Sequence, residues 1–294
     1  MDQLFGGVET GGTWTVCALG DGRGRLAARE QFRTGPPEHT ISEIAAFFNA
    51  HDRPAAVGVG AFGPLDLRPG SPTWGEVTTT PKADWRRFPL ATRIRDELGL
   101  PVAFDTDVNA AAVGEHRWGA GRDCGSLCYL TVGTGIGAGI LVDGRPLHGL
   151  VHPEAGHMLI GHDPVRDPFA GVCPVHGDCW EGLAGGEAIA ARWGADASEL
   201  PDDHPGWALE VDYLALGILA IVMIISPQRV IAGGGVMERP GLRGATGTRL
   251  LELAGGYLET PLLGERIGEY LVAPELGDDA GVLGAIALAG AIAH

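Results

Sequence analysis

Two glycine-rich hairpins constrain the fold of this chain more than any other feature. Residues 4–20 read LFGGVETGGTWTVCALG, with apolar runs on both sides of a Gly/Thr turn. Residues 126–147 read SLCYLTVGTGIGAGILVDGRPL and repeat that layout. Alternating apolar segments joined by such a turn are typical of β-hairpins. Because a similar unit recurs about 120 residues later, we expect an internal duplication and two related lobes.

The segments around these hairpins alternate between strand and helix patterns. Strands are expected at the start of 101–119, within 55–67 and at 229–237, where glycines are followed by a helix start. Helices are expected at 40–51, 89–98, 185–193, 207–226 and in the second half of 101–119, and residues 161–180 read as a loop. This alternation predicts an α/β fold.

An apolar C-terminal helix with an acidic start completes the pattern. Acidic residues suit the positive N-terminal end of a helix dipole. We expect this helix to return to the first lobe. The predicted lobes are then residues 1–112 plus 279–294, and residues 113–278.

Charge and cysteine content exclude several classes of protein. The formal net charge is −16, which argues against nucleic-acid and anionic-membrane partners because both need basic surfaces. The longest apolar run, residues 213–226, is too short to cross a bilayer and is expected to be a buried helix. The chain shows no signal-peptide pattern, and its five cysteines form no disulfide framework. A cytoplasmic protein with reduced thiols is expected.

The glycine turns are candidate phosphate sites. Left-handed glycines let backbone N–H groups converge on an anion. The turn Gly11-Gly12-Thr13 offers this, TVGTGIGAG offers it again, and GGG at 233–235 follows a third strand. The alternative is that these glycines serve only tight turns. Neither a P-loop nor a dinucleotide-binding fingerprint is present.

The stretch CPVHGDCWEG carries metal-ligand spacing. Cys173, His176 and Cys179 place three zinc-type ligands within seven residues. The alternatives are a reduced thiol pair beside a surface histidine, or a disulfide loop. A fourth ligand must come from a neighbouring segment, and the donors nearby in sequence include His152, His162 and Asp178.

Two carboxylates stand at a predicted strand-to-helix turn in FDTDVNAAA. Asp105 and Asp107 lie two residues apart there. Asp107 suits two roles: a general base that takes a proton from a hydroxyl, or a helix N-cap, where Asp is favoured in any case.

The motifs together resemble a known family. GVETGGT, DTDVNAAAVGE, TVGTGIGAG, HPEAGH, CPVHGDCWEGLAGG and IAGGGV occur in the order of the ROK sugar kinases. FGPLD, TTTPKADW and the spelling CPVHGDC are similar to its bacterial fructokinase branch. The resemblance covers essentially the whole chain. It implies a two-lobed actin-like, hexokinase-like ATPase fold built from duplicated ribonuclease H-like domains.

The resemblance also implies roles for individual residues. Asp107 corresponds to the catalytic base. The implied ATP-binding residues are Thr10, Gly11, Gly12, Thr13, Thr134, Gly135, Gly137, Gly233, Gly234 and Gly235. The implied sugar-binding residues are Gly63, Asp66, Asn109, Glu154, His157 and Glu181. His157 would also complete a structural zinc site with Cys173, His176 and Cys179, and Mg²⁺ would accompany ATP.

One position departs from the family pattern. Where ROK kinases usually read D-x-G-G-T-K, this chain has Trp14 after the turn, so a phosphate contact by that side chain is in question. Glu9 in place of Asp is similar to the fructokinase branch. Lys82 is the only lysine of the chain and stands in TTTPKADW. It is either a pocket residue or a solvated surface lysine.

The implied activity is ATP-dependent conversion of D-fructose to D-fructose 6-phosphate in a cytoplasmic homodimer. A glucokinase, a mannokinase or a broad-specificity hexokinase is the alternative within the family. A sugar-responsive repressor is disfavoured, because those proteins place a helix-turn-helix before the first motif and Glu9 arrives almost at once. A chaperone-like or cytoskeletal ATPase of the same fold is disfavoured by HPEAGH and the cysteine loop.

Overall fold

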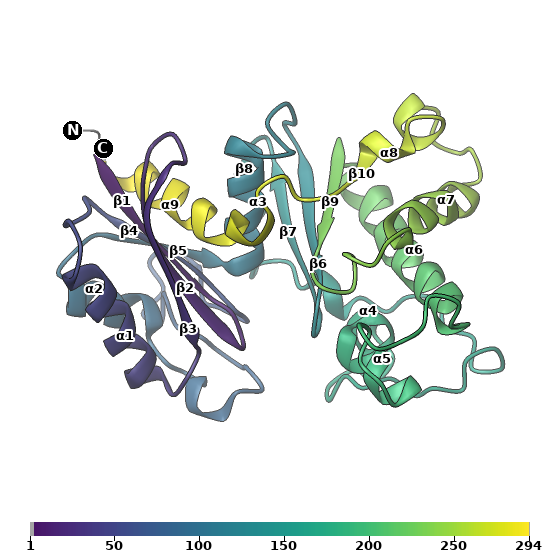
Figure 1. Ribbon diagram of the computed structural model, residues 1–294, viewed down its shortest axis with the longest axis horizontal. Helices are drawn as coiled ribbons and strands as arrows, with labels where there is room; N and C mark the ends of the chain where they lie inside the picture. The colour runs from purple at the N-terminus through teal and green to yellow at the C-terminus, as the bar shows by residue number, and fades with distance from the viewer. Residues whose placement is uncertain (1–2, 294) are drawn as a thin grey trace. The chain divides into compact units, whose positions relative to one another are not determined.

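The computed structural model describes residues 3–293 and contains two five-stranded sheets (Figure 1). The first sheet has the order β3 (Leu26–Arg33), β2 (Trp14–Asp21), β1 (Leu4–Thr10), β4 (Val57–Ala61) and β5 (Val102–Thr106). The second has the order β10 (Leu271–Val272), β9 (Arg229–Gly233), β6 (Leu127–Val132), β7 (Ile136–Val142) and β8 (Arg145–Pro146).

The two sheets repeat one topology. In the first, β1 pairs antiparallel with β2 and parallel with β4, which pairs parallel with β5. In the second, β6 pairs parallel with β9, β9 parallel with β10, and β7 antiparallel with β8. Strands 1 to 5 therefore correspond to strands 6 to 10 in order. This correspondence confirms the duplicated α/β fold predicted from the two hairpins.

The chain forms two compact units. Unit 1 consists of residues 1–123, 139–153 and 275–294, and unit 2 of residues 124–138 and 154–274. The lobe boundaries expected from the sequence, at residues 112 and 278, remain a proposal about which segments would move together.

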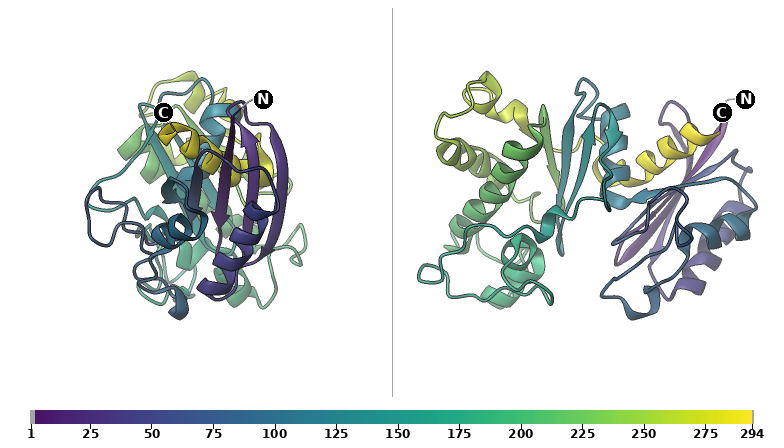
Figure 2. Two further views of the ribbon diagram at one scale, coloured as in Figure 1. Left: turned by 90° about the vertical axis from the view of Figure 1, so that its left-hand side faces the viewer. Right: turned by 180° about the vertical axis from the view of Figure 1, so that it is seen from behind.

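In unit 1, helices cover both faces of the first sheet (Figure 2). Helices α1 (Pro37–Asn49) and α2 (Leu90–Leu98) bury their apolar side chains in a core on one face. Helix α9 (Ala280–Ile292) packs on the other face, against a second core that includes Phe5 and Val16. Glycines permit this close approach, because a Cβ at Gly58 of β4 would overlap the carbonyl oxygen of Ala285.

Helix α3 (Asp107–Trp118) packs directly along α9 in the same unit. A Cβ at Gly284 would overlap the carbonyl oxygen of Ala110, and one at Gly114 would overlap that of Ala280. Because α3 follows β5 without a linker, its tight seat on α9 fixes where its first residue lies.

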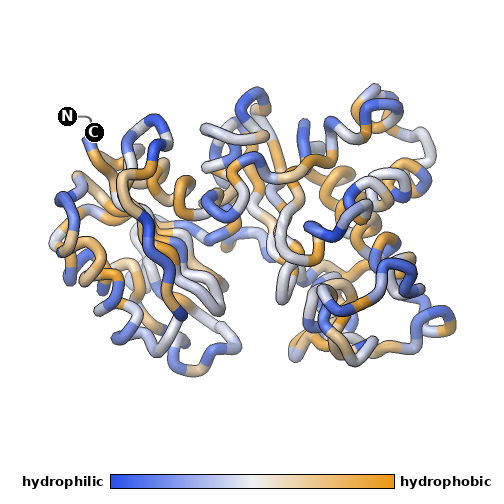
Figure 3. The backbone as a smooth tube through the Cα atoms, viewed as in Figure 1, coloured by the Kyte–Doolittle hydropathy of each residue, from blue (hydrophilic) through white to orange (hydrophobic). Residues whose placement is uncertain are grey.

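In unit 2, the longest helix is α6 (Gly206–Ile225). Its length and composition would allow it to cross a membrane, but it packs against α7 (Leu242–Ala254) and against α4 (Trp180–Ala184), whose Trp180 ring lies against Gly217. Its second half, from Leu214 on, contains only apolar residues and one glycine, as the hydropathy colouring of Figure 3 reflects. The buried helix expected at the apolar run is therefore present. The shorter helices of this unit are α5 (Gly186–Trp193) and α8 (Ile267–Tyr270).

Most expected elements lie within a few residues of their predicted bounds, with one clear exception. We expected a helix directly after the glycines at 233–235, but that expectation is wrong, because α7 begins only at Leu242. The intervening residues form turns, in which the amide of Glu238 donates to the carbonyl of Gly234. Pro240 and the left-handed Gly241 (φ 81°) then delay the helix.

Candidate functional site

Unit 1 gathers three of the predicted motifs at one edge of its sheet. Thr10, the last residue of β1, is in register with Ala61, the last residue of β4, and Ala61 is in register with Thr106, the last residue of β5. All three strands are parallel, so their carboxyl ends meet. The glycine turn, the FGPLD loop and Asp107 therefore follow one another across adjacent strand ends, where open α/β sheets bind their ligands.

The turn at residues 11–13 presents backbone amides to solvent. The Gly11 amide donates to the Trp14 carbonyl, whereas no partner for the amides of Gly12 and Thr13 is found among residues 3–293. Neither Gly11 nor Gly12 has positive φ, so the expectation of left-handed glycines is wrong at this turn. A Cβ on Gly12 would meet only the Cε atom of Lys82, at 3.5 Å. The fold itself therefore does not require glycine at position 12.

Asp107 is the first residue of α3, but it is not the helix cap. The Thr106 hydroxyl accepts the Asn109 amide at 3.1 Å and caps the helix. Asp107 instead accepts the amide of Val108 through Oδ1 at 2.9 Å. Desolvation raises the pKa of its carboxyl group to about 6, against a smaller lowering by that amide. The N-cap interpretation of Asp107 therefore fails, and its carboxylate remains available as a base.

A second carboxyl group lies close to Asp107 at the end of β1. Burial, and then the charge of Asp107, raise the pKa of Glu9 to about 8. A Cβ on Gly281 would overlap the Glu9 carboxylate, so this side chain sits against the first turn of α9. Two adjacent carboxyl groups of this kind suit a hard divalent cation, which favours oxygen ligands.

Asp105 and Asn109 form a buried network behind Asp107. The Asn109 amide Nδ2 donates to Asp105 Oδ1 at 2.7 Å, and His148 Nε2 lies 3.0 Å from Asp105 Oδ2. The Asp105 carboxylate raises the pKa of His148 by hydrogen bonding. No sequence pattern indicates this pairing, because helix α3 and strands β6 to β8 lie between Asp105 and His148 along the chain. This network fixes the Asn109 carboxamide beside the start of α3.

The FGPLD loop orders itself through Asp66. This buried carboxylate accepts hydrogen bonds from the Arg68 guanidinium and from the hydroxyls of Ser71 and Thr73, and the Arg68 hydrogen bonds hold its pKa far below its usual range. Gly63 precedes Pro64 through a cis peptide bond. The Asp66 side chain therefore stabilises the loop that contains it.

His152, which was a competing metal donor, also lies in unit 1 and serves the same loop. Its Nε2 accepts the Leu65 amide at 2.9 Å. Burial lowers the pKa of His152, in keeping with a neutral imidazole that accepts through this nitrogen.

Unit 2 brings its two glycine clusters to neighbouring strand ends. Thr131 of β6 is in register with Gly233 of β9, and the Val236 amide donates to the Val132 carbonyl at 3.0 Å. Gly234 has φ 90°, the left-handed conformation that favours glycine. The 233–235 segment therefore lies beside the end of β6, where the loop that contains Thr134 and Gly135 begins.

Next to Gly235 lies a cavity of about 340 Å³. It is lined in part by Trp207, Glu238 and Arg239. The Arg239 guanidinium stacks on the Trp207 ring at 3.9 Å. A flat cation held in this way offers a second face to a planar ligand.

Glu181 connects the glycine loop at residues 133–136 to the cysteine-containing segment. Its Oε2 accepts the Ile136 amide at 2.9 Å, and a Cβ on Gly135 would overlap the same oxygen. The first turn of α5 adds two backbone bonds, from Gly186 to the Gly133 carbonyl and from Glu187 to the Thr134 carbonyl. Residues of α4 and α5 therefore stabilise the glycine loop at residues 133–136 through hydrogen bonds.

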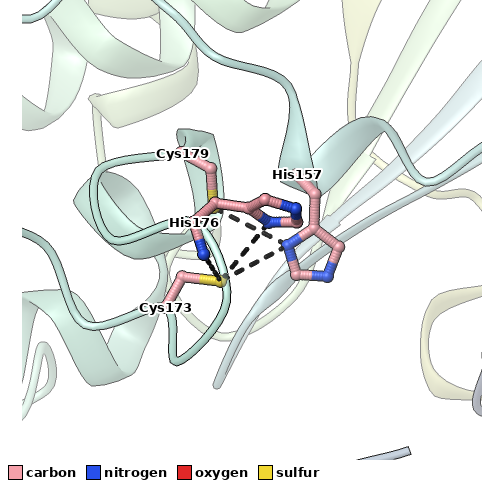
Figure 4. A group of neighbouring side chains, drawn as sticks. All are labelled: His157, Cys173, His176 and Cys179. Carbon is pink, nitrogen blue, oxygen red and sulfur yellow. Dashed lines mark hydrogen bonds between the residues drawn. The ribbon is translucent and has the colours of Figure 1, made fainter. Parts of the chain in front are cut away.

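The predicted zinc ligands converge on one point (Figure 4). His157 Nδ1 lies 3.7 Å from Cys173 Sγ and 3.6 Å from Cys179 Sγ, and His176 Nδ1 lies 3.7 Å from Cys173 Sγ. All four ligand atoms lie within 4.8 Å of one another. Tetrahedral zinc, at about 2.3 Å from sulfur and about 2.0–2.1 Å from nitrogen, spaces these ligands by about 3.6 Å. The cluster therefore fits a four-coordinate zinc ion.

Local backbone geometry explains how this cluster forms. Cys173 and Gly177 exchange backbone hydrogen bonds, and Gly177 turns the chain at φ 63°. Cys179 is fully buried at the start of α4. Of the remaining competing donors, His162 Nδ1 lies 3.0 Å from Asp178 Oδ2. His157 is thus the fourth ligand-type residue.

The Nδ1 atom of His157 faces the two cysteine sulfurs, so its Nε2 lies on the other side of the ring (Figure 4). Glu154 is exposed and starts the short turn, Ala155–His157, that carries this histidine. An acid and an imidazole on one turn beside a metal cluster can bind vicinal hydroxyls.

The similarity of this chain to known proteins extends over nearly its whole length. The ROK family model matches residues 5–292. A fructokinase from Zymomonas mobilis is 41% identical over 295 residues, with 98% of this chain and 96% of that protein covered. A ROK hexokinase structure from Thermus thermophilus is 26% identical with a TM-score of 0.80, covering 98% of each chain. A ROK glucokinase from Streptomyces griseus, solved with glucose and AMPPNP, is 27% identical with a TM-score of 0.77, covering 98% and 99%.

Proposed function

The chain belongs to the ROK family and is a sugar kinase of that family, and from this premise we propose that it transfers the γ-phosphoryl group of ATP to D-fructose, giving D-fructose 6-phosphate. The related fructokinase, aligned over nearly the whole chain, supports fructose as the acceptor.

One observation supports the reaction above all others. Thr10, Ala61 and Thr106 are in register at the ends of three parallel strands of unit 1. The segments that follow them therefore share one sheet edge: the Gly12 and Thr13 amides, the FGPLD loop, and the Asp107 carboxylate, which does not cap its helix. Phosphoryl transfer depends mainly on positioning and on neutralising charge. The edge offers both: amides for phosphate oxygens, and Asp107 for the proton of the attacking hydroxyl.

Asp107 acts as the general base in this proposal. A pKa of about 6 leaves most of the carboxyl group ionised near neutral pH while keeping it basic enough to accept a proton. Mg²⁺ would supply positive charge to the triphosphate when bound, and the carboxyl group of Glu9 is an oxygen donor of unit 1 that suits it. Asn109 and His148 hold the surrounding side chains in place.

A structural zinc ion organises the sugar-binding residues in unit 2. His157, Cys173, His176 and Cys179 would hold the ion, which would supply rigidity and no open coordination position. Those ligands order the turn that carries Glu154 and the helix that carries Glu181. We propose Glu154, His157 and Glu181 of unit 2 as hydrogen-bonding partners of the hexose.

The nucleotide base occupies the cavity next to Gly235 in this proposal. Adenine would stack on the Arg239 guanidinium, which already rests on Trp207. The glycines at 133–135 and 233–235 would then lie along the ribose and phosphates. We further propose a cytoplasmic homodimer, as the family resemblance implies.

A coupled assay across fructose, mannose, glucose and N-acetylated amino sugars tests the acceptor. We expect kcat/KM to be highest for fructose. Equal turnover of glucose would replace the fructokinase assignment by a broad-specificity hexokinase or glucokinase, and hydrolysis of ATP that no sugar changes would remove the kinase assignment.

A further inference from the structure

We propose that Lys82 binds the terminal phosphates of the nucleotide and supplies the positive charge that the turn at residues 11–13 lacks. The proposal rests on the kinase function above and adds a charged group to its phosphate site. It uses only residues of unit 1.

The position of Lys82 is the first argument. Its Cε atom is the single heavy atom within 4 Å of where a Cβ on Gly12 would stand, at 3.5 Å. The ammonium nitrogen of Lys82 is bonded directly to this Cε atom. It therefore lies beside the amides of Gly12 and Thr13, for which no partner is found in the described part of the chain.

The segment that carries Lys82 is anchored to the same turn. The buried Trp85 donates its indole N–H to the Gly35 carbonyl at 3.1 Å. The neighbouring Thr34 donates its hydroxyl to Gly11 and its amide to Thr13. Arg86 donates to the Thr80 carbonyl and closes the segment on itself. Lys82 is therefore held near the turn by hydrogen bonds on both sides.

The charge of Lys82 is uncompensated. Within residues 3–293, no carboxylate lies within ion-pair distance of its ammonium group, although the chain has 37 acidic residues and a net charge of −16. Its ammonium faces the Phe62 ring at 6.0 Å from the centroid. A free ammonium next to two open amides forms a site for phosphate oxygens.

Arg33 is the competing cation. It stands opposite Trp14 across the β2–β3 ladder, and its guanidinium lies 4.1 Å from the Trp14 ring centroid. Trp14 directly follows the turn, so Arg33 also lies at this edge. However, its guanidinium is already stacked on Trp14, and no Arg33 atom lies within 4 Å of the Cβ position of Gly12. We therefore assign the phosphate contact to Lys82 and use Arg33 as the matched control.

The chain offers a direct test, because Lys82 is its only lysine. An amine-reactive acetylating reagent modifies Lys82 and the N-terminal amine, and peptide mass spectrometry follows both rates. We expect Mg²⁺ with a non-hydrolysable ATP analogue to slow Lys82 modification at least about tenfold, while fructose alone leaves it unchanged and the N-terminal amine serves as internal reference. Equal Lys82 rates with and without the analogue would overturn the proposal.

Variants supply the second readout. Loss of one charge-assisted contact corresponds to about a 10- to 100-fold change. We expect Lys82→Met to lower kcat/KM for ATP by that factor while KM for fructose, at saturating ATP, stays within about twofold. Lys82→Arg should recover most of the loss, and Arg33→Met should change kcat/KM for ATP less than about threefold. A larger effect at Arg33 than at Lys82 would reassign the contact and refute the proposal.

These outcomes are separable from failure of the proposed function. If no sugar is phosphorylated by the wild-type protein, the kinase proposal fails, whereas nucleotide protection of Lys82 can still be measured. Melting temperatures of the variants show whether each one folds.

Discussion

Replacement of Gly12 by alanine separates what the fold needs from what the ligand needs. The added Cβ would meet only Lys82 Cε, at an ordinary contact distance of 3.5 Å, and the backbone at Gly12 is not left-handed. Nothing in the folded chain therefore opposes the methyl group. Because alanine also restricts the unfolded chain, we expect the free energy of unfolding to stay the same or to rise by about 0.4–1 kcal/mol.

Activity should respond in the opposite direction. If phosphate oxygens approach the Gly12 and Thr13 amides, the same methyl group occupies part of their space. Loss of one such hydrogen bond to a charged group is worth about 1.5–3 kcal/mol, or about a 10- to 150-fold decrease in kcat/KM for ATP. Steady-state kinetics with varied ATP and urea unfolding of the same preparation measure both quantities.

Two glycines calibrate the result. Gly244 in α7 has no heavy atom within 4 Å of its Cβ position, so Gly244→Ala should raise stability by about 0.5–1 kcal/mol and leave the kinetics unchanged. Gly58→Ala should destabilise strongly, because its Cβ would overlap a carbonyl of α9. If Gly12→Ala lost stability as Gly58→Ala does, or kept wild-type kinetics for ATP, the placement of phosphate at this turn would be refuted.

Three further predictions concern charge and metal. Asp107→Asn should lower kcat by about 10²–10⁴-fold with sugar binding retained, as measured by calorimetry; near-normal turnover would remove Asp107 as the base. Cys179→Ser should lower zinc content by elemental analysis and reduce the melting temperature by more than about 5 °C, whereas Cys124→Ser, also buried, should keep the metal; an unchanged zinc content in Cys179→Ser would contradict the cluster. Folding raises the pKa of Glu9 from 4.5 to about 8, so the folded state binds a proton that the unfolded state releases, and the free energy of unfolding should fall as pH rises from about 4.5 to about 8. In urea titrations without Mg²⁺, Glu9→Gln should flatten this pH dependence. An unchanged pH dependence in the variant would show that Glu9 is not its source.

Much of the fold and of the candidate site could be predicted from local sequence patterns. Hairpins, turn glycines and ligand spacing depend on residues close in sequence, and the duplicated topology and the cysteine cluster both follow from them. The Asp143-Gly144 turn is one instance, since both residues have positive φ as a tight hairpin requires.

Tertiary pairing explains what the sequence did not reveal. The Asp66 carboxylate accepts hydrogen bonds from Arg68, Ser71 and Thr73, whose positions only the folded loop defines. His148 pairs with Asp105 across a long stretch of chain. The cap of α3 also went unrecognised, because Thr106 and Asp107 are both good capping residues and only the backbone decides between them.

Glu181 shows why a metal site and a phosphate loop occur together in unit 2. Cys179 begins the short helix α4, so any ligand bond at Cys179 fixes the helix that positions Glu181 two residues later. Glu181 in turn accepts the Ile136 amide and leaves room only for glycine at position 135. Loss of the metal should therefore disturb the loop at 133–136 as well as the His157 ring, because the metal would hold His157 directly and the loop through Cys179 and Glu181. Chelation is then expected to weaken nucleotide binding together with sugar binding, and a chelated protein that lost sugar affinity alone would show that Glu181 does not couple the two.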